Sequence, residues 1–149
     1  MLSLHIEWLS QRGGRDHNED ACGHWQSPQQ LCAVLADGAG GHGGGDIASK
    51  MAVRELVGRF SQHPTTSAGE LGMLLRDVND VVLAEQAPGT VKQQMHSTVV
   101  CLVINLIDGQ VHWAHAGDSR MYWFREGRLL QRTRDHSLVQ SLVDAGIVQ

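Results

Sequence analysis

The chain has 149 residues, of which 42% are hydrophobic and 19% are charged, and its formal net charge is −4. This composition excludes wholesale disorder, and the acidic balance excludes the polycationic surface typical of nucleic-acid-binding proteins. No apolar run reaches the length of a membrane span, and the N-terminus lacks the regions of a secretory signal, so no membrane partner is expected. Three cysteines without a C-x-x-C pair predict neither a disulfide framework nor a zinc knuckle. We expect one domain over residues 1–149, in the reducing cytoplasm.

The N-terminal third contains predicted strands that lead into a glycine-rich loop. Three segments have the apolar alternation or the continuous apolar run of strands: residues 4–8, 20–26 and 31–36. A polar, glycine-containing loop is expected over 11–19. The last strand ends at Asp37, directly before a loop in which six glycines fall within eight residues. A loop so rich in glycine is able to adopt positive φ angles, and we expect it to wrap closely around something.

Two helices are expected after the glycine-rich loop. Asp46 is the predicted N-cap of the first, over residues 47–60, because its side chain can accept a bond from a free backbone N–H. Ser67 and Glu70 have the spacing of a capping box and predict the start of the second helix. Residues 86–95 are expected to form an exposed loop.

From Thr98 onward the spacing of apolar residues changes to that of a sheet. Hairpin signals at Asp108–Gly109 and Glu126–Gly127 predict consecutive antiparallel strands. A last helix is expected over 136–145, with Gly146 as its C-cap. Because consecutive hairpins favour antiparallel pairing, the predicted fold class is α+β rather than the parallel winding of βαβ units.

Candidate chemistry begins at the end of the buried strand. The carboxylate of Asp37, followed by exposed loop carbonyls, suits a hard cation such as Mg²⁺ or Mn²⁺, and a flexible turn capped by Asp37 is the equally weighted alternative. No G-K-[ST] follows, which argues against a Walker-type nucleotide loop. Arg15 offers a planar donor fork suited to phosphate. The adjacent acids Glu19 and Asp20 are either part of this chemistry or simply solvated.

Two further polar clusters lie nearer the C-terminus. In residues 115–120, Asp118 and Arg120 either serve a site or close a tight turn by pairing with each other. In residues 133–137, a helix cap formed by Asp135 or Ser137 is the favoured interpretation. A histidine-rich transition-metal site is a weaker alternative, because the nine histidines are scattered along the chain.

The order of these clusters is more specific than any one of them. They are R-x-x-N-E-D from Arg15, D-G-x-G-G-H-x-x-G-D-x-A-S from Asp37, A-G-D-S-R from Ala116 and T-x-D-H-S from Thr133. This series resembles the metal-dependent serine/threonine protein phosphatases of the PP2C (PPM) family, most closely the bacterial branch. His42 belongs to the bacterial form of the second motif, whereas Ala39 replaces the Met or His of many relatives.

The resemblance implies a fold and a chemistry. The fold is an antiparallel β-sandwich flanked by helices, the αββα arrangement of PP2C proteins. The chemistry is hydrolysis of phosphoserine and phosphothreonine by a hydroxide that bridges two Mn²⁺ or Mg²⁺ ions, with a third, weaker metal site. The residues implied are Arg15 for the substrate phosphate, Asp20, Asp37, the Gly38 carbonyl and Asp118 for metal, and Glu19 beside the metal centre.

The end of the chain departs from the family pattern. Family catalytic domains continue further and carry two more metal-ligating carboxylates, whereas only Asp144 follows Asp135 here. The resemblance therefore implies an under-coordinated metal centre and an incomplete sandwich, whose uncovered edges favour self-association. Three alternatives stay open: a fragment of a longer phosphatase, a natural truncation that dimerises or binds its complement, and a pseudophosphatase that binds phosphoproteins without cleaving them. The implied partners are phosphorylated proteins and a cognate serine/threonine kinase.

Overall fold

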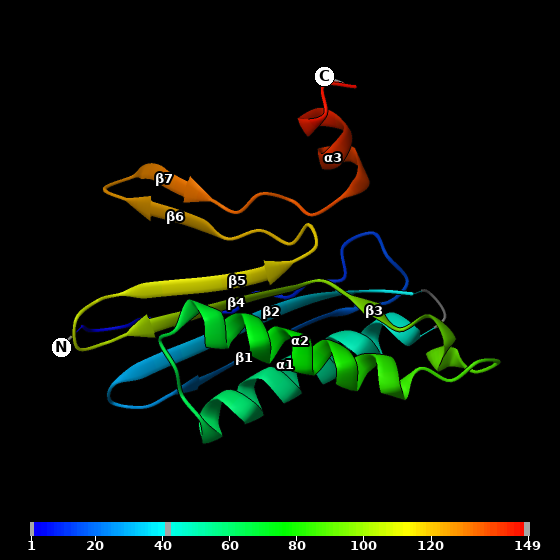
Figure 1. Ribbon diagram of the computed structural model, residues 1–149, viewed down its shortest axis with the longest axis horizontal. Helices are drawn as coiled ribbons and strands as arrows, with labels where there is room; N and C mark the ends of the chain where they lie inside the picture. The colour runs from blue at the N-terminus through cyan, green and yellow to red at the C-terminus, as the bar shows by residue number, and fades with distance from the viewer. Residues whose placement is uncertain (1, 41–42, 148–149) are drawn as a thin grey trace.

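A helix-covered antiparallel sheet forms the larger part of the molecule (Figure 1). The computed structural model describes residues 2–40 and 43–147. Four strands run in the order β1–β2–β4–β5, and the short β3 pairs with β2 beyond β4. Their bounds are β1 Asp20–Gln26, β2 Gln30–Ala39, β3 His96–Ser97, β4 Val99–Asn105 and β5 Val111–Ala116. All of these strands pair antiparallel, so the predicted α+β class is confirmed.

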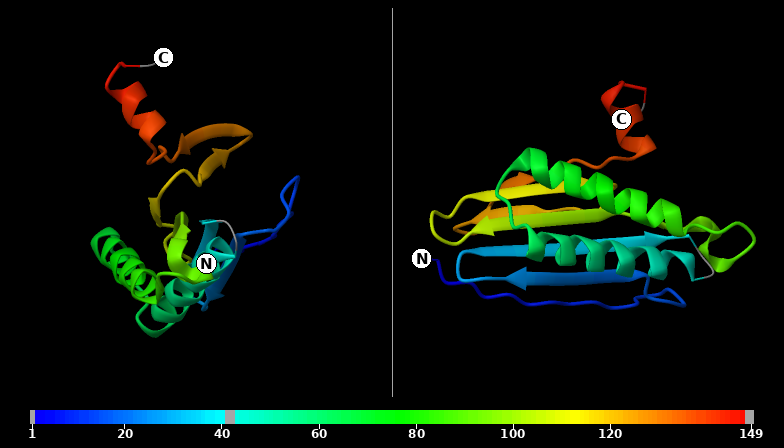
Figure 2. Two further views of the ribbon diagram at one scale, coloured as in Figure 1. Left: turned by 90° about the vertical axis from the view of Figure 1, so that its right-hand side faces the viewer. Right: turned by 60° about the horizontal axis from the view of Figure 1, so that its bottom comes forward.

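Two long helices lie side by side over one face of this sheet (Figure 2). They are α1, Gly44–Gln62, and α2, Ala68–Glu85. The core lies between α1, α2 and the inner faces of β2 and β4, with Phe60 and Leu56 of α1 fully buried. Trp25 of β1 packs edge-on against Phe60, with ring centroids 5.8 Å apart. Burial of this apolar area is the main force that holds the helices on the sheet.

The predicted strand over residues 4–8 is wrong, because the structure has no strand between residues 2 and 19. The backbone of this segment bonds to the main sheet region at its start, where the Leu2 N–H donates to the Leu106 carbonyl at 2.9 Å. Its Trp8 ring stacks on His24 of β1 at 5.7 Å. The alternating apolar side chains of residues 4–8 therefore make side-chain contacts, and their backbone does not pair with a neighbouring strand.

The helix starts differ from expectation in one case and agree in the other. Asp46 does not cap α1: the N-cap is Gly43, without a side-chain bond, and Asp46 lies in the first turn and pairs with Lys50 at 3.0 Å. A carboxylate in that position interacts favourably with the helix dipole. Ser67 does cap α2, since its hydroxyl accepts a bond from the Glu70 N–H.

The segment between α2 and β3 is more ordered than the expected exposed loop. It contains a 3-10 helix, η1, Val91–Gln94, whose N-cap is Thr90. Met95, which follows it, is buried and packs with Ala48 of α1. The segment is therefore fastened to the start of α1 rather than solvated along its length.

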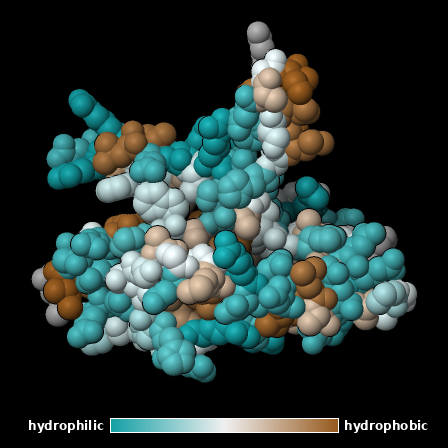
Figure 3. Space-filling model, in the orientation of Figure 1, coloured by the Kyte–Doolittle hydropathy of each residue, from teal (hydrophilic) through white to brown (hydrophobic). Residues whose placement is uncertain are grey.

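The C-terminal part stands away from the main sheet. It consists of a hairpin of β6, Tyr122–Arg125, and β7, Arg128–Arg132, followed by α3, Leu138–Asp144. Every residue of the two hairpin strands is exposed. The space-filling view shows hydrophobic side chains on the hairpin and on α3 (Figure 3). The large exposed ones are Tyr122, Trp123, Phe124, Leu129, Leu130, Leu138, Val139, Val143 and Ile147.

The predicted end of the last helix is close to the observed one. Ala145 is the C-cap of α3, and Gly146 follows with the left-handed φ of 70° that glycine adopts without strain. Within the described residues, no helix combines the length and hydropathy needed to cross a membrane.

Candidate active site

Two of the predicted site carboxylates come from facing positions on adjacent strands. Asp20 begins β1 and Asp37 lies near the end of β2, and the antiparallel register sets them directly opposite each other. An open groove of about 500 Å³ passes over this end of the sheet. Its lining includes the predicted residues Arg15, Glu19, Asp20, Asp37, Gly38 and Asp118. The fold therefore brings segments from three distant parts of the chain to one groove.

The charge around Asp37 is unfavourable for an ionised carboxylate. Partial burial raises the pKa of Asp37, and the neighbouring carboxylates of Asp20 and Asp118 raise it further, while the Arg15 guanidinium lowers it. Like charges held close together resist simultaneous ionisation. A bound cation would relieve this repulsion, so the all-oxygen donor set fits a hard divalent metal such as Mg²⁺ or Mn²⁺.

The carboxylates do not by themselves form a complete ligand cluster. Across residues 2–40 and 43–147, no group of three or more His, Cys, Asp or Glu side chains is arranged to hold a metal ion. The individual metal ligands expected from the motifs, including the Gly38 carbonyl, stay predictions. His42 lies outside the described residues.

Thr98 holds Asp37 in place, a role that the motifs did not predict. The Thr98 hydroxyl accepts a bond from the Asp37 N–H at 3.1 Å, and the Thr98 N–H donates to the Asp37 carbonyl at 2.9 Å. The same hydroxyl lies 2.5 Å from the Ser119 hydroxyl, next to Asp118. One side chain thus joins the segments that carry two of the site carboxylates.

The glycines of the Asp37 motif permit close contact between backbones. A Cβ on Gly38 would lie 2.0 Å from the Gly45 carbonyl oxygen, and one on Gly40 would lie 1.9 Å from the Gln94 carbonyl oxygen. Among the described residues of this loop, only Gly43 has a positive φ, of 92°. The expected close wrapping is present, because the loop packs on the start of α1 and on η1.

Ser49, within the same motif, ties α1 to the segment before β1. Its hydroxyl is fully buried and donates to the Glu19 carbonyl at 2.5 Å. The Glu19 side chain itself approaches the backbone of Gly45, where an added Cβ would lie 2.9 Å from a carboxylate oxygen. Glu19 is therefore held against the start of α1 while it also lines the groove.

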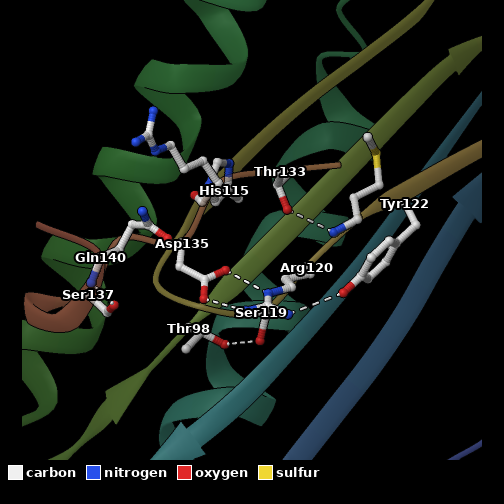
Figure 4. Close-up of polar contacts among 11 residues, drawn as sticks. Thr98, His115, Ser119, Arg120, Tyr122, Thr133, Asp135, Ser137 and Gln140 are labelled. Carbon is white, nitrogen blue, oxygen red and sulfur yellow. Dashed lines mark hydrogen bonds and ion pairs between the residues drawn. The ribbon is translucent and has the colours of Figure 1, made fainter. Parts of the chain in front are cut away.

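Residues of the A-G-D-S-R and T-x-D-H-S motifs contact each other (Figure 4). Asp118 does not pair with Arg120; instead the Arg120 guanidinium donates two bonds of 2.7 Å to the Asp135 carboxylate. This pairing holds the pKa of Asp135 below its ordinary value. The His136 N–H donates to the Gly117 carbonyl at 2.9 Å, and Ser137, not Asp135, caps α3. The T-x-D-H-S motif therefore fastens the turn that carries Asp118.

The comparisons with known proteins agree with this arrangement. The profile of the family described as protein phosphatase 2C matches residues 10–138. The chain belongs to the protein phosphatase 2C family. It is 34% identical over 150 residues to the serine/threonine phosphatase stp of Listeria welshimeri, a match that covers 96% of this chain and 59% of that relative.

Solved structures of PP2C phosphatases share the fold. Stp1 from Staphylococcus aureus superposes with a TM-score of 0.82 at 29% identity, over 100% of this chain and 63% of that one. The catalytic domain of the phosphatase PstP, solved in complex with two manganese ions, superposes with a TM-score of 0.71 at 30% identity, over 95% of this chain and 60% of that one. The chain thus spans about three fifths of the length of these relatives.

Proposed function

We propose that this chain carries the substrate-phosphate and metal-binding groove of a phosphoprotein phosphatase that acts on phosphoserine and phosphothreonine. The observation that carries the proposal is the presence of Arg15 in one groove with Asp20, Asp37 and Asp118. A guanidinium binds a phosphate dianion through paired hydrogen bonds, and carboxylates bind the cations that neutralise it. Family membership supports phosphorylated proteins as substrates and a serine/threonine kinase as the opposing enzyme.

Each residue has a separate task in this proposal. Arg15 would orient the phosphate. Asp20, Asp37 and the Gly38 carbonyl would hold two divalent cations, Mn²⁺ or Mg²⁺, and Asp118 would serve a third. Cations so held would activate the attacking water and stabilise charge on the phosphoryl oxygens. Thr98 would keep the Asp37 backbone in place through its two hydrogen bonds. The chain itself needs no nucleophilic side chain.

A phosphoprotein-binding module is the alternative that one observation favours. The described residues contain no ready-made group of three metal-ligating side chains, although Arg15 lines the same groove. A groove of this kind would retain a phosphorylated peptide without cleaving it. The two functions differ in whether divalent metal produces turnover.

The test is hydrolysis of p-nitrophenyl phosphate by the purified 149-residue chain, in Mn²⁺ and in EDTA. We expect Mn²⁺-dependent turnover that Asp37→Asn lowers by about a hundredfold or more, the effect typical of losing one preorganised charge-stabilising group. Asp80→Asn makes the same chemical change on an exposed face of α2 and should leave turnover unchanged. Near-normal turnover by Asp37→Asn would refute its role. Phosphopeptide binding without turnover by the folded chain would support the binding module instead.

A further inference from the structure

A second cavity lies behind the groove, between α2 and the sheet. Its volume is about 170 Å³. Its walls are mainly the apolar side chains of α1, α2 and the segment before β3, including Ala52, Leu56, Val78, Val82 and Met95. An engineered apolar cavity of about 150 Å³ in another protein binds benzene. The cavity is therefore large enough for a small aromatic ring.

Two of the polar residues that line this cavity are exposed, while Ser97 and Thr98 are half-buried. Asn79 of α2 and His96 of β3 are both exposed and both line the cavity, so they lie at its mouth. Asn79 can accept and donate a hydrogen bond through its side-chain amide. An apolar interior with a few polar groups is the usual character of a small-molecule site. The matching ligand has an aromatic body and one hydrogen-bonding edge.

The cavity and the groove share a wall. Thr98 lines both, and it is the residue whose backbone and hydroxyl bind the backbone of Asp37. Ala116 lines the cavity two residues before Asp118. Between them, Gly117 packs so tightly on Thr98 that an added Cβ would lie 2.7 Å from the Thr98 methyl carbon. A molecule in the cavity would thus press on the segments that carry two groove carboxylates.

We propose that this cavity binds a small aromatic molecule with one polar edge, of the indole or phenol class, and that its occupancy shifts Thr98 and the Gly117 turn. The interior takes the ring, and Asn79 at the mouth takes the polar edge. The site lies outside the groove and needs neither metal nor phosphate for binding. Its occupancy is therefore measurable whether or not the chain hydrolyses phosphate.

The experiment is a titration of the metal-free 149-residue chain with indole, followed by backbone amide NMR. We expect saturable shifts at residues that line the cavity and, in the same titration, at Thr98 and Gly117. Val82→Phe fills the cavity and should weaken indole binding by more than about tenfold, equivalent to about 1.4 kcal/mol. Met73→Phe is the matched control, because Met73 is an exposed residue of the same helix that does not line the cavity.

A second variant keeps the test valid if Val82→Phe fails to fold. Asn79→Leu changes only an exposed residue and should weaken indole binding while leaving benzene binding unchanged. Absence of saturable indole binding by the folded wild-type chain would overturn the site. Binding without any shift at Thr98 or Gly117 would overturn the link to the groove. If the wild-type chain binds indole but does not hydrolyse phosphate, the proposed function fails and the cavity proposal stands.

Discussion

The helix-covered sheet and the C-terminal hairpin differ in burial although both carry large apolar side chains. Phe60 of α1 is 0% exposed, whereas Phe124 of β6 is 59% exposed. In the first region, two helices supply a second layer for the sheet. In the described structure, the Arg120–Asp135 pair joins the two ends of the hairpin, and the His136 N–H bonds to the Gly117 carbonyl directly after β5. The apolar side chains of a strand thus do not by themselves indicate whether another layer covers them.

The largest expected effect tests this difference directly. Phe60→Ala should lower the free energy of unfolding by about 3–5 kcal/mol, the cost of a cavity in a packed core. Phe124→Ala removes the same side chain from an exposed strand and should change it by less than about 0.5 kcal/mol. Urea denaturation of both variants measures the comparison. Equal losses would mean that the hairpin is packed against another surface in solution.

The next effect is the change in stability when alanine replaces a crowded or an uncrowded glycine of the helix-covered sheet. Gly38→Ala places a Cβ 2.0 Å from a backbone oxygen and should cost about 1–3 kcal/mol of stability through overpacking. A Cβ added at Gly58, inside α1, would meet no other atom within 4 Å. Gly58→Ala should therefore stabilise the chain by about 0.4–1 kcal/mol. Thermal unfolding of the two variants should move in opposite directions, and a shift in the same direction would contradict the crowding argument.

The smallest effect concerns the attachment of the hairpin. Hydrogen bonds from Arg120 are the main cause that lowers the pKa of Asp135 from its ordinary 3.8. A carboxyl with a lowered pKa stabilises the folded state above its ordinary pKa, and this contribution is lost as the pH falls through the lower, folded value. The contact is exposed, so water screens it and the effect is modest.

We therefore expect the hairpin amides to gain mobility on acidification from about pH 6 to about pH 2 before the amides of α1 do. Heteronuclear NOE values measure this. Asp135→Asn should show the raised hairpin mobility already at the higher pH. If the wild-type hairpin keeps its rigidity after Asp135 is protonated, the ion pair at its base is not what orders it.

Local patterns predicted most of the elements, because their causes lie within a few residues. The N-cap at Ser67 and the turn at Glu126–Gly127 are confirmed, since each depends on neighbouring backbone groups. The second bond of the capping box is absent, because the Ser67 N–H donates to the Thr65 hydroxyl and not to Glu70. The strand over residues 4–8 is wrong because its alternation reflects a stack between Trp8 and His24, which pattern alone does not distinguish from a ladder. The N-cap at Asp46 is wrong because tight packing of the glycine loop allows α1 to begin earlier.

The site was predictable through its motifs, but its supports were not. The motif residues Arg15, Asp20, Asp37 and Asp118 do line one groove. Thr98 and Ser49 were missed as supports because their hydrogen-bond partners lie 61 and 30 residues away. Nothing in the local sequence of a threonine or serine indicates such a partner. Ser49 belongs to the Asp37 motif, but the motif does not identify its contact, and Thr98 lies outside the four motifs.

The register of β1 against β2 has a thermodynamic consequence. Asp20 and Asp37 face each other across an antiparallel pair, where like charges destabilise the sheet. Repulsion between the two carboxylates thus destabilises this end of the sheet whenever both are ionised. Any cation that binds there also stabilises the native state by mass action. If this groove binds divalent ions as proposed, their concentration would also set the population of folded chains.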